Sequence, residues 1–301
     1  MTLTIRFEID ANELFAQHPP RITNPNKRRV FEKAGSSHGG RLGVTRWAEI
    51  EPVARDGSAL AIEAHADMFQ YGPTAPGAID WHLNFADPSL FFAYGGPMFA
   101  QDEIQVAEHP ALAALRERLR TQGADSTVES GASTPVLVKG VERRVAIDTR
   151  GIYGRAFSSA RPEQIDKAAR VLDPPTISNI IAMAAPAGGR GKYRSLEIDR
   201  IVATAYTGFT AAKSESGEQR VVIHTGFWGC GAFGGNRILM PLLQLIAARW
   251  AGVDRLVFHA VDLPGMAAFD QARKYLVGLG DAPTTTRIAA LGLEWGTSDG
   301  N

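Results

Sequence analysis

The sequence predicts an α/β fold: a three-layer sandwich in which helices cover both faces of a largely parallel or mixed sheet. Strand-like apolar runs alternate with helical patterns along most of the 301 residues. Hydrophobic residues make up 45% and charged residues 21%, which is the composition of an ordinary globular protein, and the length suffices for a sizeable core. We therefore expect a single domain over residues 1–301, with residues 1–78 as an N-terminal extension packed on it.

The first hundred residues carry weak local signals. Residues 1–50 are mixed, and the basic stretch from Arg21 to Lys33 is expected to be a solvated face, with a phosphate-facing patch as the alternative. Residues 58–72 suit a strand or a short helix. Residues 80–86 alternate polar and apolar side chains before an Asp-Pro turn, which predicts a strand.

The rest of the chain shows clearer periodicity. Residues 101–108 are expected to be helical, and Pro110 opens a second helix that continues to Leu119. Residues 121–135 are small and polar and predict a surface loop. The remaining elements are strands at 143–148, 177–184, 221–224 and 256–261, helices at 195–212 and 238–251, and two short helices at the end.

Composition excludes several classes of protein. Lys+Arg and Asp+Glu both number 32, so there is no strong signal for binding nucleic acid through bulk positive charge. The single cysteine, Cys230, excludes an internal disulfide framework and a multi-cysteine zinc site. No apolar window is long enough for a membrane span, and no signal peptide is apparent. We expect a soluble, cytoplasmic protein with no membrane partner.

A glycine-rich turn is the most informative segment. Residues 225–236 read TGFWGCGAFGGN, between a predicted strand and a predicted helix. Glycine lets a ligand approach the backbone, and N–H groups at a helix start favour an anion, so a diphosphate is the expected guest. Phe227, Trp228 and Phe233 could wall a nucleoside; a structural loop with packed aromatics is the alternative. The turn lies too late in the chain for a Rossmann fingerprint and lacks the lysine of a Walker A loop.

A pair of adjacent carboxylates forms the second candidate feature. Gln101, Asp102 and Glu103 stand at a predicted helix start, just after an aromatic loop. One interpretation is ordinary acidic residues that suit the helix dipole. The other is a general acid for glycosidic cleavage, which needs a raised pKa. A helix N-terminus lowers a carboxylate pKa and burial raises it, so the sequence leaves both interpretations open.

These motifs together resemble a known family, the poly(ADP-ribose) glycohydrolases. The segment TGFWGCGAFGGN resembles their second glycine-rich loop, and LNFAD at 83–87 followed by QDE at 101–103 resembles their strand and Gln-Glu-Glu signature. Supporting similarities are VAID at 145–148, AAP at 184–186, ATAYTGF at 203–209 and LVFHAVD at 256–262. The resemblance covers roughly residues 80–262 and implies a macrodomain-like fold.

The resemblance also implies residue roles. Glu103 would be the catalytic glutamate, which protonates the leaving ribose oxygen and then helps water to attack. Asp102 would help to hold a ribose, and Gln101 would contact the adenine side. The substrate-binding residues implied by the resemblance are Gln101, Asn84, Asp87, Gly226, Phe227, Trp228, Gly229, Gly231, Ala232, Phe233 and Gly234.

The implied activity is that of a glycosidase which cleaves an O-glycosidic ribose linkage in ADP-ribose or an ADP-ribosylated macromolecule. No cofactor or metal is expected, because backbone N–H groups can meet the phosphate charge. Where the family has three consecutive glycines, residues 91–93 read Phe-Phe-Ala. Two alternatives therefore stay open: a macrodomain that binds ADP-ribose or another nucleotide without turnover, and a hydrolase of a different nucleotide glycoside.

Three further side chains draw attention by type alone. His224 and His259 lack metal-ligand spacing and are expected to be satisfied core histidines. Cys230 between two glycines is expected to be a small buried thiol rather than a nucleophile, because no base is evident nearby.

Overall fold

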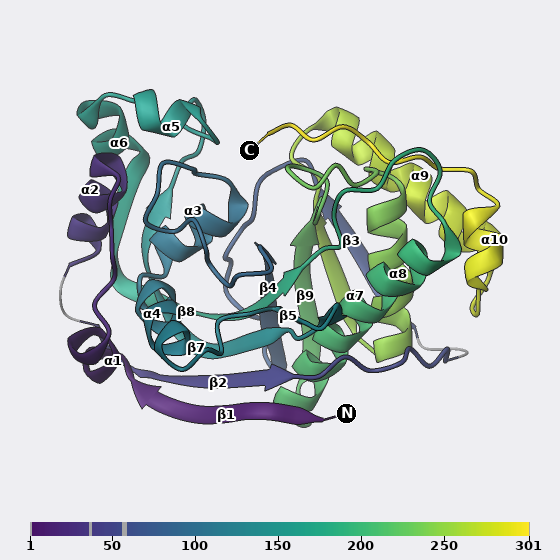
Figure 1. Cartoon of the computed structure of the whole chain (residues 1–301), viewed down its shortest axis with the longest axis horizontal. Helices are drawn as coiled ribbons and strands as arrows, with labels where there is room; N and C mark the ends of the chain where they lie inside the picture. Colours follow the sequence, from purple (N-terminus) through teal and green to yellow (C-terminus); the bar gives the residue numbers. More distant parts are fainter. Residues whose placement is uncertain (1, 36–37, 56–58, 301) are drawn as a thin grey trace.

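The computed structural model describes residues 2–35, 38–55 and 59–300. Within them, eight strands form one sheet in the order β1-β2-β7-β8-β4-β9-β10-β3, and helices cover both of its faces (Figure 1). Strands β8, β4, β9, β10 and β3 are mutually parallel, whereas β1, β2 and β7 alternate in direction. The predicted three-layer α/β sandwich around a mixed sheet is confirmed.

The strands are β1 (Leu3–Asp10), β2 (Arg41–Trp47), β3 (Ala61–His65), β4 (Ala78–Ala86), β5 (Val128–Glu129), β6 (Ala132–Ser133), β7 (Val136–Ile147), β8 (Ala169–Ala184), β9 (Arg220–Gly226) and β10 (Arg255–His259). The helices are α1 (Ala11–Gln17), α2 (Pro25–Ala34), α3 (Gln101–Glu108), α4 (Ala111–Thr121), α5 (Ala156–Ser159), α6 (Pro162–Ala168), α7 (Ser195–Glu215), α8 (Leu239–Ala251), α9 (Leu263–Leu279) and α10 (Thr285–Ala289).

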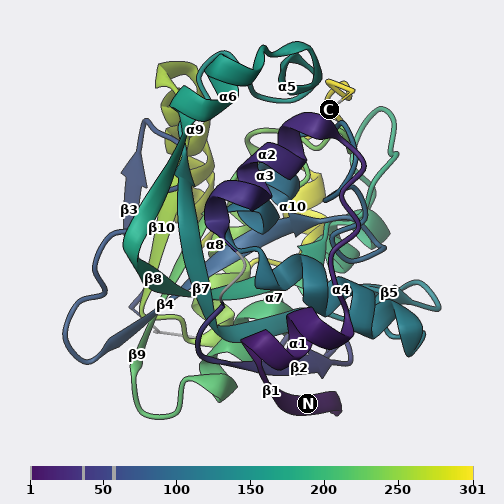
Figure 2. The same cartoon turned by 90° about the vertical axis from the view of Figure 1, so that its left-hand side faces the viewer.

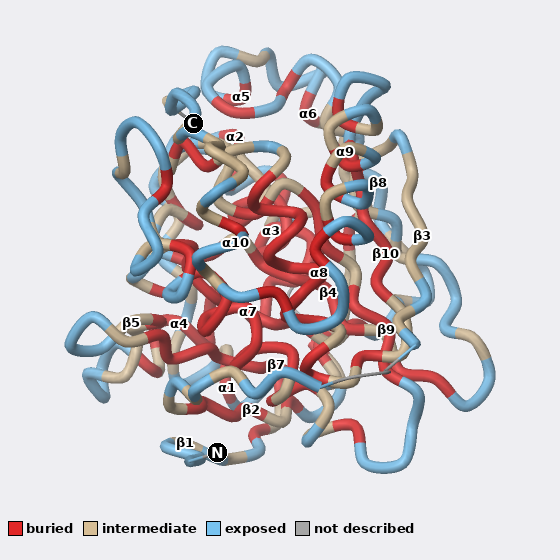
Figure 3. The backbone as a smooth tube through the Cα atoms, turned by 90° about the vertical axis from the view of Figure 1, so that its right-hand side faces the viewer, coloured by how far each residue is buried: buried red, intermediate tan, exposed pale blue. Residues whose placement is uncertain are grey.

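The central strands are covered on both faces. In β8, Ile181 and Met183 join the core cluster that contains α7 and α8, whereas Ile180 and Ala182 join the cluster that contains α4. This alternation explains why residues 177–184 are almost continuously apolar, as is usual for a buried parallel strand. Figure 2 shows α1 to α4 on one side of the sheet, and Figure 3 shows the buried backbone that runs through the centre of the molecule.

The predicted elements between residues 80 and 261 are confirmed, although β7 and β8 begin seven or eight residues earlier than expected. The polar loop at 121–135 contains the small β5–β6 hairpin. The prediction of two short helices at the end is wrong for α9, which has 17 residues. The buried positions of α9 recur every three or four residues and form only a narrow stripe. Such a stripe is harder to recognise in the sequence than a wide apolar face.

The N-terminal segment 1–78, which we expected to pack on the domain as an extension, contributes strands to the sheet within its described residues. Strand β2 pairs with β7, β1 pairs with β2 at one edge, and β3 pairs with β10 at the other edge. Within the predicted segment 58–72, residues 61–65 form a strand, and residue 58 lies outside the described residues. The prediction that 1–301 is one domain stays a prediction. No helix in the described part of the chain is both long and apolar enough to cross a membrane.

Candidate active site

The first turn of α3 is attached to the end of β4. The Gln101 side chain accepts a hydrogen bond from the Phe85 N–H at 2.8 Å and donates one to the Leu83 carbonyl at 3.0 Å. The side-chain amide of Gln101 thereby makes hydrogen bonds of the kind that a neighbouring strand would make. It satisfies the Phe85 N–H and the Leu83 carbonyl, which lie beyond the part of β4 that pairs with β9. As a result, the two carboxylates that follow Gln101 are fixed at the C-terminal edge of the parallel strands.

Asp102 is buried against strand β4. Its Oδ1 accepts a hydrogen bond of 3.0 Å from Nδ2 of Asn84, which is itself fully buried. Burial, and then repulsion from Glu103, raises the pKa of Asp102 well above its ordinary value. For this residue, burial outweighs the opposing effects of the Asn84 hydrogen bond and of the Lys27 charge. The Oδ1 atom of Asn84 has no hydrogen-bond partner within the described residues, so a buried acceptor stands next to the acid pair.

Glu103 caps its own helix. Its side chain is only 4% exposed, and its Oε2 accepts a hydrogen bond from the Ala100 N–H at 2.8 Å. The carboxylate therefore satisfies one of the free N–H groups at the start of α3. Tyr153 lies close enough for its ionisation to be affected: partial burial and then the charges of Asp299 and Glu103 raise the pKa of Tyr153 to about 12.

A lysine from the N-terminal region faces the same acids. Lys27 is fully buried near the start of α2, and its Nζ donates a hydrogen bond of 2.7 Å to the Ala93 carbonyl. Burial lowers the pKa of Lys27 to about 8, and the charges of Glu103 and Asp102 oppose that decrease. The prediction of a solvated basic face is therefore wrong for Lys27, although Arg21 is largely exposed.

The glycine loop, residues 226–235, begins at the same sheet edge. Strands β4 and β9 are parallel neighbours, so the loop that follows β9 emerges beside the end of β4. A Cβ placed on Gly226 would lie 3.4 Å from Cζ of Phe85, the residue whose N–H binds Gln101. The structure thus brings the two predicted features to one place, with Phe85 between them.

The shape of the loop depends on glycine at Gly229. Its φ is +76°, and a Cβ there would lie 2.6 Å from the Cβ of Ala185. Trp228 supports the loop from behind, because its side chain is fully buried and its indole N–H donates to the Met183 carbonyl at 3.0 Å. Phe227 and Phe233 are half-buried and Ala232 is exposed, so these side chains are accessible at the loop surface.

A later segment lies against this loop. Nδ2 of Asn236 donates to the Glu294 carbonyl at 2.7 Å, and the Asp299 carboxylate is 3.3 Å from where a Cβ on Gly231 would be. The Gly300 carbonyl then accepts a hydrogen bond of 2.9 Å from Nη2 of Arg155. Residues 294–300 therefore connect the glycine loop with Arg155, the residue before α5. Figure 1 shows the C-terminus, at the end of the yellow trace, on the side of the molecule where α5 lies.

Phe91 and Phe92, which stand where the resembling family has its glycine triplet, differ in burial. Phe91 has φ +53°, a left-handed conformation that favours glycine, yet its ring is fully buried in the cluster with α4. Phe92 is 64% exposed, and the guanidinium of Arg116 is 5.9 Å from its ring. Asp87, nearer β4, accepts the Ser89 N–H at 2.9 Å in a tight turn.

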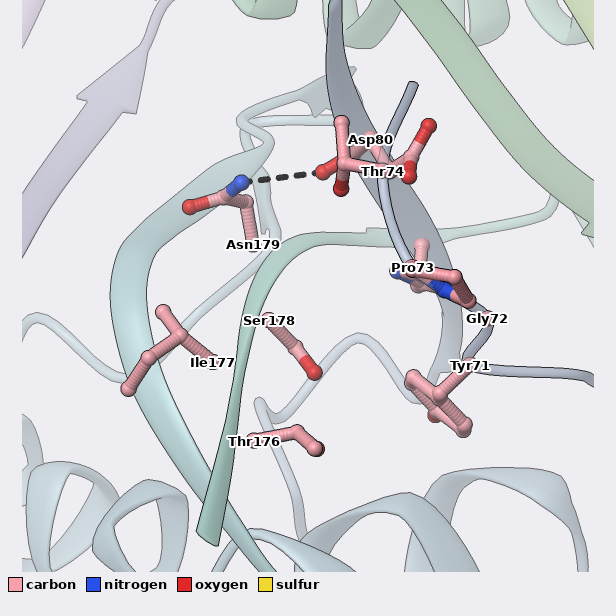
Figure 4. A pocket seen from close by; sticks show the side chains of 10 residues that line it. Tyr71, Gly72, Pro73, Thr74, Asp80, Thr176, Ile177, Ser178 and Asn179 are labelled. Carbon is pink, nitrogen blue, oxygen red and sulfur yellow. Dashed lines mark hydrogen bonds between the residues drawn. The ribbon is translucent and has the colours of Figure 1, made fainter. Parts of the chain in front are cut away.

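Two cavities, of about 420 and 400 Å³, lie away from the acid pair and the glycine loop. The first is lined by residues of β4, β8 and the segment 71–74 (Figure 4), and the second by residues of β3, β9 and β10. Neither is lined by Glu103 or by residues 226–235. The cavities therefore lie outside the predicted site.

A row of histidines accompanies the second cavity. Nδ1 of His224 and Nε2 of His259 are 3.3 Å apart, and Nδ1 of His259 is 3.0 Å from Asp67. Burial lowers the pKa of His259 to about 4. His259 is thus a buried, hydrogen-bonded histidine, as expected. No group of three or more His, Cys, Asp or Glu side chains among the described residues is arranged to hold a metal ion.

Cys230 is a free, half-buried cysteine in the glycine loop. Burial raises the pKa of its thiol, so the thiolate that a nucleophile requires is disfavoured. The raised pKa agrees with the expectation that Cys230 is not a nucleophile, but the residue is half-buried and not buried as expected.

Comparisons with known proteins support the resemblance. Residues 128–267 match a family model described as "Poly (ADP-ribose) glycohydrolase (PARG), Macro domain fold". The matched segment includes the glycine loop but not Gln101 to Glu103. The predicted resemblance to poly(ADP-ribose) glycohydrolase-like macrodomains is confirmed.

Solved structures of similar fold include a poly(ADP-ribose) glycohydrolase from Thermomonospora curvata, with a TM-score of 0.51 and 17% identity over 87% of this chain and 98% of that chain. The glycohydrolase from the same organism bound to the inhibitor ADP-HPD matches with a TM-score of 0.50 and 18% identity, over 86% of this chain and 88% of that chain. At this level of identity the likeness shows the macrodomain fold.

The sequence analysis singled out the acid pair and the glycine loop, whose roles stay predictions, but it did not single out Lys27 or Tyr153. The Asn-Pro pair at 24–25 marks the helix start that carries Lys27, because Asn24 caps α2 and Pro25 occupies its first turn. No local pattern indicates that the lysine is buried, since its neighbours Arg28 and Arg29 are exposed on the same helix.

Proposed function

We propose that this protein is an ADP-ribose-directed glycohydrolase that cleaves an O-glycosidic ribose linkage with Glu103 as general acid and base. The observation that carries the proposal is that the buried pair Asp102 and Glu103 stands at the same sheet edge as the glycine loop. The substrate is ADP-ribose linked to another ADP-ribose unit or to a macromolecule.

The glycine loop binds the diphosphate in this proposal. Backbone N–H groups of residues 226–234 supply hydrogen bonds without side chains that would hold the ligand away. Phe227 and Phe233 then contact the ribose, and Trp228 keeps the loop in place from the core. Main-chain dipoles can meet the phosphate charge, so the binding step needs no metal ion.

The acid pair performs the bond cleavage. Glu103 donates a proton to the ribose oxygen that leaves, and the resulting carboxylate takes a proton from the water that attacks the anomeric carbon. Asp102, held by Asn84, binds a ribose hydroxyl, and Asp87 borders the same sugar. Gln101, fixed on β4, borders the adenine side.

Glu103 has to leave its helix cap to act. In the described conformation its Oε2 is bound to the Ala100 N–H, so this oxygen is engaged with the backbone and is not free to contact a substrate. The reaction therefore requires the cap bond to be exchanged for a bond to the substrate.

The test is release of ADP-ribose from poly(ADP-ribosyl)ated protein by the wild type and by Glu103→Gln. Loss of the acid should slow release by about 100- to 10,000-fold, with little change in ADP-ribose affinity. Glu218→Gln, in the exposed turn before β9, is a control that should keep the wild-type rate. Equal rates for wild type and Glu103→Gln would remove Glu103 from the mechanism.

A second candidate function is ADP-ribose binding without turnover. It is favoured by Phe91 to Ala93 in place of the glycine triplet and by the Glu103 cap bond. Calorimetric binding of ADP-ribose with no product after long incubation would favour this function. Absence of binding would exclude both functions and indicate a different nucleotide glycoside.

A further inference from the structure

The segment 294–300 reaches from the glycine loop toward the start of α3. At its far end, the Gly300 carbonyl accepts a hydrogen bond of 2.9 Å from Nη2 of Arg155. The N–H of Gly154, the residue before Arg155, donates to the Phe99 carbonyl at 2.8 Å, just before α3 begins. The segment therefore adjoins both features that the proposed ligand would contact.

The middle of this segment packs against the backbone of the glycine loop. A Cβ on Gly234 would lie 3.2 Å from the Gly296 carbonyl oxygen and 3.3 Å from the Ser298 backbone nitrogen. A Cβ on Gly296 would lie 3.3 Å from the Gly235 carbonyl oxygen. Glycine on both sides allows the two backbones to approach this closely. Gly234 is accordingly buried, whereas residues 231–233 are half-buried or exposed.

The carboxylate of Asp299 lies against the tip of the same loop. Its Oδ2 and Oδ1 atoms are 3.3 and 3.6 Å from where a Cβ on Gly231 would be. Asp299 is an exposed residue, so burial in the core does not fix its side chain at this place. A ligand of the loop can therefore replace the carboxylate without disrupting the core.

The tip of the loop offers donors for an anion. The N–H of Gly234 is used within the loop, because it donates to the Gly231 carbonyl at 3.0 Å. The N–H groups of residues 231–233 make no hydrogen bond within the described part of the chain. Successive N–H groups in a turn can form an anion-binding concavity. A carboxylate and a phosphate are both negatively charged acceptors, so Asp299 and a diphosphate suit the same donors.

We infer that Asp299 is an internal competitor for the anion position of the glycine loop. Its carboxylate stands beside the backbone groups that bind the diphosphate of ADP-ribose in the proposed function. Two negative groups at one place repel each other, so the ligand has to displace Asp299 from the loop. The identity of the ligand rests on the proposed function, whereas the competition applies to any phosphate-bearing ligand of this loop.

The first experiment measures the Kd of inorganic pyrophosphate and of ADP-ribose by calorimetry for wild type, Asp299→Asn and Glu294→Gln. Asp299→Asn keeps the size of the side chain and removes its charge, so both ligands should bind about five- to tenfold more tightly. Glu294→Gln is the matched control, because Glu294 is an exposed acid of the same segment and the net charge changes equally. This variant should keep both Kd values within about twofold of wild type.

Three results would overturn the inference. Unchanged or weaker binding in Asp299→Asn would show that the carboxylate is a bystander or itself holds the ligand. An equal gain in Glu294→Gln would show that net charge alone is responsible. Failure of both ligands to bind any of the three proteins would show that the loop is not an anion site.

A substitution without a change of charge tests the displacement itself. Gly296→Ala places a Cβ 3.3 Å from the Gly235 carbonyl oxygen and 3.4 Å from the Gly234 carbonyl oxygen. Because residues 296–299 are exposed and Gly234 and Gly235 are buried, the segment should give way rather than the loop. Pyrophosphate should then bind more tightly than to wild type, by a smaller factor than in Asp299→Asn. Unchanged or weaker binding would contradict the displacement.

Hydrolysis separates this inference from the proposed function. In an active enzyme, Asp299→Asn should lower KM for poly(ADP-ribosyl)ated protein by about the factor seen in Kd and change kcat less, because the competitor acts on binding. Tighter pyrophosphate binding in Asp299→Asn without any wild-type hydrolysis would keep the competitor and reject the glycohydrolase function. Wild-type hydrolysis with an unchanged KM in Asp299→Asn would keep the function and reject the competitor.

Discussion

The two walls of the candidate site are built in different ways. The glycine loop is one continuous segment, residues 226–235, and it contains no carboxylate or lysine. The acid wall combines Lys27 from α2, Asn84 from β4 and the acid pair from α3, which are far apart in the chain. The first wall presents backbone to a ligand, and the second presents charges whose state depends on burial.

This difference explains how each wall responds to change. The glycine loop is sensitive to substitutions that add side-chain volume or that disfavour a positive φ, because an added Cβ would collide with neighbouring atoms that cannot move away. A wall of buried ionisable groups is sensitive to pH and to removal of single charges. Substitutions and pH therefore test the two walls separately.

The largest effect is expected in the glycine loop. Gly229→Ala should lower the free energy of unfolding by about 3 kcal/mol, because a positive φ costs about 1–2 kcal/mol and overpacking adds about as much. Gly231→Ala is the matched control: the nearest neighbour of its new Cβ is the end of the Asp299 side chain at 3.3 Å and not backbone, and we expect a loss below about 0.5 kcal/mol. Urea unfolding measures both, and equal losses would contradict the packing argument.

A smaller effect is expected from pH at the end of α3. Burial lowers the pKa of His109 to about 3, from the ordinary value of 6.5. The unfolded chain therefore binds a proton first, so this contribution to stability is complete above about pH 6.5 and is lost as pH falls toward 3. Relative to His109→Gln, wild type should lose about 2 kcal/mol between pH 7 and pH 5. A pH-independent difference between the two unfolding curves would contradict it.

The smallest effect is expected at Phe92, an exposed aromatic in the loop between β4 and α3. Phe92→Ala should change stability by less than about 0.5 kcal/mol and leave the Kd for ADP-ribose unchanged, because the ring is 64% exposed and lies over Arg116. Phe233→Ala, in the glycine loop, is the comparison and should weaken binding several-fold. Calorimetry measures both, and a tenfold loss in Phe92→Ala would show that this ring reaches the ligand.

The sequence predicted what depends on local order. The alternation of polar and apolar residues at 80–86 predicted strand β4. The predicted strand and helix on either side of the glycine loop indicated that it connects the two. The two acids before Ile104 indicated where α3 begins. Parallel strands place their following loops at one edge, so it was also foreseeable that the start of α3 and the glycine loop share an edge of the sheet.

What the sequence did not predict depends on tertiary packing. Lys27 has the same local surroundings as the exposed Arg28, and only the position of α2 against α3 buries one of them. Phe91 breaks the expected glycine triplet, yet its ring fills the core beside α4 instead of the site. The raised pKa of Asp102 likewise required its burial to be known.

The central claim is that the α3 start and the glycine loop form one ADP-ribose site. Hydrogen–deuterium exchange with and without ADP-ribose tests it most directly, because ligand contacts protect backbone amides. We predict that residues 99–104 and 226–236 are protected together, and that residues 71–74 beside the first cavity are unchanged. Protection at 71–74 alone, or at neither wall, would contradict the account.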